Sequence, residues 1–115
     1  ELGRSLFDFR NGMKRIGQWD NTLIMTYSEF GRRTVENHTD GTDHGTAAPH
    51  FIMGGAVQGG ILGNHPDLGA LVEGDMQFTM DYRAVYERVL SDWFGIRENK
   101  FASFRNNNLS SMIKL

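Results

Sequence analysis

The stretch Thr22-Leu23-Ile24-Met25-Thr26-Tyr27 decides the fold class of this chain. It is short, largely apolar and β-prone, which is typical of a strand buried on both faces of a sheet. Ahead of it, apolar residues recur at spacings of four, three, four and three, which predicts one stripe of a helix that stops at Gly17. The stripe consists of Leu2, Leu6, Phe9, Met13 and Ile16. A helix followed by a buried strand predicts an α/β sheet fold.

A second strand is predicted from His50 to Gly54, or on to Val57, because an apolar run there meets glycine pairs that mark bends. The segment from Ile61 to Met80 is expected to be mostly loop, with a short strand near Ala70-Leu71-Val72. No internal repeat and no linker rich in proline or serine divides the chain. Residues 1–115 are therefore expected to have no internal domain boundary.

A second helix is predicted with Thr79 or Asp81 as its N-cap and with Gly95 at its end. Its broad apolar face consists of Tyr82, Val85, Tyr86, Val89, Leu90 and Trp93. A face of this breadth indicates packing in the core. The tail from Phe101 to Leu115 has scattered apolar residues and is expected to pack over the core as an irregular extension.

The composition excludes several classes of protein. The formal net charge is −2 and no basic run is longer than Arg32-Arg33, so a nucleic-acid partner is not expected. The chain has no cysteine, which excludes a disulfide framework and a thiolate metal site. No apolar stretch approaches about 20 residues, the length that crosses a bilayer, so no transmembrane segment is expected.

The polar segment from Ser28 to Ala48 has no periodicity and is expected to be a long loop that carries the chemistry. Within it, Asp43 and His44 stand side by side between Gly41 and Gly45, and His50 follows six residues after His44. Carboxylate and imidazole ligands suit zinc and similar divalent ions, and glycines allow a tight backbone. The pattern predicts a metal or catalytic loop at the edge of a sheet.

Each candidate residue also has a structural interpretation. Asp43 is a metal ligand, a group that orients His44, or a cap of a turn. His44 is a functional residue or a solvent-facing loop histidine. Glu29 directly follows the first strand, where active-site residues of open α/β sheets lie, yet it could equally pair with a neighbouring arginine. His50 is a ligand or a histidine bonded to backbone. Arg32 has a fork suited to phosphate or sulfate, or is simply solvated.

Five motifs together resemble the C-terminal part of a bacterial family of uncharacterised, sulfatase-like proteins in the alkaline phosphatase and sulfatase superfamily. They occur in the family's order and with its approximate spacing, and they cover nearly the whole chain. These motifs are Thr22 to Arg32, Gly41-Thr42-Asp43-His44-Gly45, Met53 to Gly60, Thr79-Met80-Asp81-Tyr82-Arg83 and Asp92-Trp93.

The resemblance implies a C-terminal portion of an alkaline phosphatase-like three-layer α/β/α sheet domain, with residues 1–115 as one segment of it. It implies an exported or periplasmic protein, since many members begin with a twin-arginine signal. It also implies metal-dependent hydrolysis of phosphate or sulfate esters of small molecules or polysaccharides. The ion would be zinc, manganese or calcium. The rival expectations are a non-catalytic metal- or ligand-binding member of the same fold and a structural exported protein.

The resemblance also implies roles for particular residues. Asp43 and His44 would hold the metal or support its ligands, Glu29 and His50 would be further ligands, and Arg32 would contact the anion. The superfamily commonly has an Asp-His-Gly metal motif at the end of a buried strand, where this chain has Glu29-Phe30-Gly31. Phe30 cannot ligate a metal. The nucleophile is expected upstream of Glu1.

Because the nucleophile is expected outside residues 1–115, this 115-residue chain alone should be catalytically inert. The measurement is turnover of a generic aryl phosphate and a generic aryl sulfate. Turnover by the chain that is abolished by His44→Ala would sink this prediction.

Overall fold

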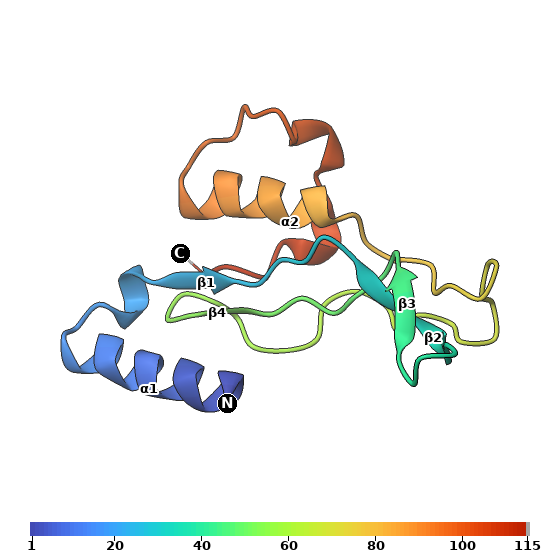
Figure 1. Ribbon diagram of the computed structural model, residues 1–115. Coiled ribbons are helices and arrows are strands. Elements are labelled where there is room, and N and C mark those ends of the chain that lie inside the picture. The colour runs from blue at the N-terminus through green and yellow to red at the C-terminus, as the bar shows by residue number, and fades with distance from the viewer. Residues whose placement is uncertain (115) are drawn as a thin grey trace.

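Residues 1–114, which the computed structural model describes, form a small mixed α/β fold with two α-helices and two antiparallel two-stranded sheets (Figure 1). The helices are α1 (Leu2–Arg15) and α2 (Tyr82–Arg88), and the strands are β1 (Leu23–Met25), β2 (Gly31–Glu36), β3 (Thr42–Gly45) and β4 (Ile52–Gly54). A π-helical turn, Val89–Trp93, continues α2, and short 3-10 turns lie at Trp19–Asn21, Ala102–Phe104 and Asn107–Leu109.

The predicted first helix is confirmed as α1. Gly17 follows it with a φ of 68°, a conformation that favours glycine and ends helices. However, the helix buries none of its residues, and Leu2 and Ile16 at its two ends are 69% and 65% exposed. The apolar stripe therefore has no core beneath it within residues 1–114.

The predicted strands at residues 22–27 and 50–54 are confirmed in shorter form, as β1 and β4. They pair with each other in antiparallel register, with Leu23 opposite Gly54 and Met25 opposite Ile52. A Cβ on Gly54 would overlap the carbonyl oxygen of Thr22, so the close approach requires glycine there. The expected burial of the first strand on both faces was wrong, because all three β1 residues are only half-buried. Two strands make no three-layer sheet, and residues 1–114 show none.

The expectation of a structureless segment from Ser28 to Ala48 was wrong in part, because β2 and β3 form a hairpin within it. The turn uses Asp40, with a φ of 58°, followed by Gly41. The side-chain oxygen of Asn37 accepts hydrogen bonds from the backbone N–H of Thr39 and of Gly41, both at 3.0 Å. An Asp-Gly pair is a strong hairpin signal, and it outweighs the absence of apolar alternation here.

The core lies where α2, the C-terminal tail and the β1–β4 sheet meet. Its buried members are Ala84, Val89, Leu109, Met112 and Ile113, with Leu23, Met25 and Ile52 packed against them. The tail joins the sheet region through backbone bonds from Gln58 N–H to the Met112 carbonyl and from Lys114 N–H to the Ala56 carbonyl. The predicted packing of the tail over the core is thus confirmed for residues 101–114, and Leu115 lies outside the described residues.

The second predicted helix is confirmed in position, but its predicted core face is confirmed only in part. Val89 is buried and Val85 and Trp93 pack against the core, whereas Tyr82 is 57% exposed, because Ala84, Glu87, Arg88 and Ser91 take the buried positions.

Asp81 is the N-cap of α2, since its carboxylate accepts a 2.9 Å hydrogen bond from the backbone N–H of Arg83. Gly95, with a φ of 70°, follows the π-helical turn. Residues 61–80 are loop as expected. The short strand predicted at Ala70-Leu71-Val72 is replaced by a single bridge between Val72 and Asp75.

The molecule is open in shape. Its radius of gyration is 16.5 Å, whereas a compact chain of this length would have about 13 Å. In Figure 1, α1 and the β2–β3 hairpin project from opposite ends of the assembly of α2, β1 and β4. Within residues 1–114, neither helix combines the length and apolar character needed to cross a bilayer.

A buried carboxylate fastens the tail to α2. Glu87 is 0% exposed, and its Oε1 accepts hydrogen bonds from Arg105 Nε at 2.9 Å, Arg105 Nη2 at 2.7 Å and Ser91 Oγ at 2.5 Å. Burial by itself raises the pKa of Glu87, but the bonds from Arg105 and Ser91 and the charges of Arg105 and Arg88 outweigh it and lower the pKa. The carboxylate is therefore held in its charged form.

We expect Glu87→Gln to destabilise the fold by about 2 kcal/mol at pH 7, because charge-assisted hydrogen bonds are lost in a buried place. The folded pKa lies below the unfolded value of about 4.3, so the stabilisation by Glu87 is complete above that value and is lost as the pH falls through the folded pKa. Urea denaturation between pH 3 and pH 7 measures both effects. Glu98→Gln, at an exposed site, is the control. A difference between Glu87→Gln and the wild type that stays constant with pH would contradict the assignment.

Candidate functional site

One face of the hairpin carries an aromatic and cationic cluster of Phe30, Arg32 and His44. Arg32 and His44 are direct cross-strand partners, so their side chains lie on the same face. The imidazole of His44 stacks on the ring of Phe30, with centroids 3.5 Å apart and an interplanar angle of 9°. The Arg32 guanidinium carbon lies 5.0 Å from the centre of the same ring. Phe30 therefore contacts both polar side chains.

Asp43 lies on the opposite face of the hairpin from His44, because adjacent residues of a strand point to opposite sides. Its Oδ1 accepts a 3.0 Å hydrogen bond from Asn37 Nδ2. Together with Arg33 and Glu73, Asp43 and Asn37 line an open hollow on this side. The two adjacent residues that the sequence presents as one motif are thus separated by the sheet.

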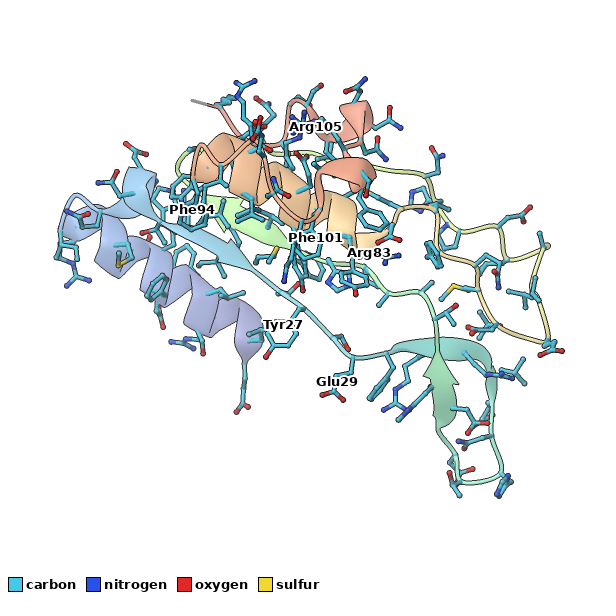
Figure 2. All side chains as sticks on the ribbon, turned by 90° about the horizontal axis from the view of Figure 1, so that it is seen from above. Tyr27, Glu29, Arg83, Phe94, Phe101 and Arg105 are labelled. Atoms are coloured by element: carbon cyan, nitrogen blue, oxygen red, sulfur yellow. The ribbon has the colours of Figure 1, made fainter. Side chains whose placement is uncertain are left out.

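His50 lies beside the end of β1, and Glu29 lies further along the chain, between β1 and β2. The ring nitrogen Nδ1 of His50 is 3.1 Å from the backbone carbonyl oxygen of Thr26, three residues before Glu29. A carbonyl only accepts hydrogen bonds, so Nδ1 must carry the proton, which leaves Nε2 of the neutral imidazole as the free acceptor. Figure 2 shows Glu29 on the segment between β1 and the hairpin, with its side chain away from the core. Both side chains are exposed.

A buried aspartate holds the hairpin against the 72–76 loop. The carboxylate of Asp75, 7% exposed, accepts hydrogen bonds from the backbone N–H of Thr46 at 3.0 and 3.3 Å. The Thr46 hydroxyl donates to the Met76 carbonyl, and Arg33 donates to the Glu73 carbonyl. A Cβ on Gly45 would come within 2.6 Å of the Asp75 carboxylate, so this contact requires glycine. The backbone between His44 and His50 is therefore fixed at its first residues.

The four predicted metal ligands fit a metal ion only in part. His50 bonds the Thr26 carbonyl through Nδ1, which leaves its other ring nitrogen free for an ion, and Glu29 follows Thr26 by three residues. Asp43 and His44, in contrast, cannot both reach one ion from opposite faces of β3. No group of three or more histidine, aspartate and glutamate side chains within residues 1–114 is arranged to hold a metal. Any metal bound through these residues would need further ligands from outside this part of the chain.

Two residues that shape the site, Asn37 and Asp75, were not predicted from the sequence, and the role of a third, Phe30, was not recognised. Asn37 orders the turn and orients Asp43, and the signal for it was the Asp40-Gly41 pair just beyond. Asp75 contacts Thr46 across 29 positions, and no local pattern could have indicated that contact. Phe30 was noticed only because it cannot ligate a metal, whereas in the structure it stacks on His44.

Comparison with known proteins identifies one family. The family model described as protein of unknown function (DUF1501) matches residues 1–101. No curated protein and no solved structure matches the chain.

We expect Asp75→Ala to weaken the attachment of the hairpin by about 2 kcal/mol, because the backbone N–H of Thr46 loses its hydrogen bond to a buried carboxylate. Amide hydrogen exchange at Thr46 and its neighbours measures the effect, and the core amides of α2 should change far less. Glu73→Gln is the matched control, since only the backbone carbonyl of Glu73 takes part in the contact. Unchanged exchange at Thr46 in Asp75→Ala would exclude this role.

Proposed function

The chain belongs to the DUF1501 family of proteins of unknown function, and we propose that it forms part of a metal-dependent hydrolase of phosphate or sulfate esters. The observation that carries the proposal is the 3.1 Å contact between His50 Nδ1 and the Thr26 carbonyl oxygen at the end of β1. A histidine oriented by a backbone carbonyl is the usual arrangement of a metal-ligating imidazole. The end of a strand is also where active-site groups of α/β sheets gather.

Glu29 and His50 would hold a divalent ion, zinc, manganese or calcium, jointly with residues outside this chain. When bound, such an ion would neutralise the charge of a phosphate or sulfate group. The residues of this chain then have separate tasks. His50 presents Nε2, Glu29 adds a carboxylate from the segment that follows β1, and Asp43 stays held by Asn37 on the far face of the hairpin.

We extend the proposal to the complete domain, for which we propose a three-layer α/β/α sheet. The support is the unburied apolar stripe of α1, since Leu2 and Ile16 stay more than half exposed and need a cover. The half-buried β1 supports it too, because its apolar residues suit a strand with further neighbours. An exported or periplasmic location and a polysaccharide or small-molecule ester as substrate complete the proposal and rest on the family resemblance.

A second candidate function is a binding protein of the same fold without catalysis. The stacking of Phe30 on His44 favours it, because an aromatic ring stands where the resemblance implies a metal ligand. Such a protein would bind phosphate or sulfate groups and would not turn them over.

The test uses the full-length protein. We expect His50→Ala to lower bound metal and turnover of an aryl phosphate or aryl sulfate by at least about tenfold, since even indirect support of a metal ligand is worth that much. Metal analysis and initial rates measure the two effects. His65→Ala, in the exposed loop, is the matched control. Equal metal content and equal rates in the two variants would refute the proposal. Bound metal without turnover would favour the second candidate function, a binding protein without catalysis.

A further inference from the structure

We propose that Arg32 and His44, cross-strand partners on the β2–β3 hairpin, bind a tetrahedral oxyanion, the phosphate or sulfate group of an ester. The inference changes the role of His44 from metal ligand to anion contact. It rests on the proposed function for the ester as substrate. The binding of the anion, however, is independent of turnover and of any metal.

The guanidinium of Arg32 is held in place but keeps most of its donors. Its Nη1 donates a 2.6 Å hydrogen bond to the Thr42 carbonyl oxygen. A guanidinium has five N–H groups, so further donors stay free for a ligand. The ion pairs among residues 1–114 join Arg83 to Asp81, Arg88 to Asp92 and Arg105 to Glu87, and none includes Arg32. An exposed, oriented guanidinium without a carboxylate partner suits the planar recognition of phosphate or sulfate.

Phe30 fixes the second donor beside the first. Its ring stacks on the His44 imidazole at 3.5 Å and lies 5.0 Å from the Arg32 guanidinium carbon. Contact with an aromatic face favours a cation and restricts the rotation of both side chains, so less conformational entropy is lost when a ligand binds. Phe30 itself is half-buried at the base of the hairpin. An aromatic residue at this position is therefore explained by support of two donors rather than by loss of a ligand.

His44 suits an anion better than a metal in this arrangement. Its strand neighbour Asp43 lies on the other face and bonds Asn37, so no carboxylate shares a metal with it there. Its cross-strand partner is a permanent cation, Arg32, which disfavours a second cation at the same place. The same arginine favours an anion. A neutral imidazole still donates one N–H, and a charged one donates two.

The experiment is a titration of the full-length protein, freed of metal with a chelator, at low ionic strength. Inorganic phosphate, inorganic sulfate and phenyl phosphate are the probes, and binding is followed by calorimetry and by the NMR signals of His44 and Arg32. We expect Arg32→Gln and His44→Gln each to lower the affinity for inorganic phosphate by about tenfold. Arg33→Gln, which removes the same charge from the next residue on the opposite face, should change it by less than about twofold. Tighter binding of phenyl phosphate than of inorganic phosphate would identify the ester as the source of the anion.

Arg32→Lys keeps the charge and serves if Arg32→Gln does not fold, which circular dichroism reveals. It should still lose several-fold in affinity because the fork is gone. Equal losses in Arg32→Gln and Arg33→Gln, or unchanged affinity in His44→Gln and Arg32→Lys, would overturn the site. Metal content that falls in His44→Gln would also overturn it, since His44 would then be a ligand. If phosphate binding follows the expected pattern but the protein shows no turnover, the anion site at Arg32 and His44 is supported and only the proposed hydrolase activity is refuted.

Discussion

The hydrogen bonds that Arg105, with a side chain 44% exposed, donates to the buried carboxylate of Glu87 hold the architecture of residues 1–114 together. Figure 2 shows Arg105 on the tail above α2, and its guanidinium donates twice to the one Glu87 oxygen. A charge that is 0% exposed is tolerated only with such compensation. The pair holds the tail against α2, and the tail contributes three of the five buried core residues, Leu109, Met112 and Ile113. In this open molecule, the hydrogen bonds between Arg105 and Glu87 fix where the apolar residues of the tail pack.

The position of the core determines the position of the candidate site. Met25 and Ile52 of the β1–β4 sheet pack against the buried cluster, and the chain leaves this packing at Thr26, where His50 is bonded. The hairpin is attached by a different buried carboxylate, Asp75, which accepts the N–H of Thr46. Two buried carboxylates, Glu87 and Asp75, thus support the two halves of the site. The half at β1 is supported by the core, and the half at the hairpin is supported by one loop.

Much of this fold could be predicted from local signals, and the site could not. The helix before Gly17, the cap at Asp81 and the strand at Leu23 each depend on neighbouring residues, and each was predicted. The hairpin was not predicted although it has an Asp-Gly turn, because β2 lacks the apolar alternation that is the usual sign of a strand. The bonds from Arg105 to Glu87 and from Thr46 to Asp75 span 18 and 29 positions, and no pattern in a single sequence pairs such residues.

Asp43 and His44 are separated because the irregular pairing of the hairpin lies on β2 and leaves β3 regular. The four steps from Arg32 to Glu36 along β2 match only the two steps from His44 to Thr42 along β3, so the extra residues lie on β2. A bulge redirects the side chains of the strand that contains it and leaves the partner strand regular. The partner here is β3, which keeps its alternation and therefore keeps Asp43 and His44 on opposite faces. The regular alternation of β3 thus gives the hairpin a cationic, aromatic face and a separate face on which a carboxylate is hydrogen-bonded.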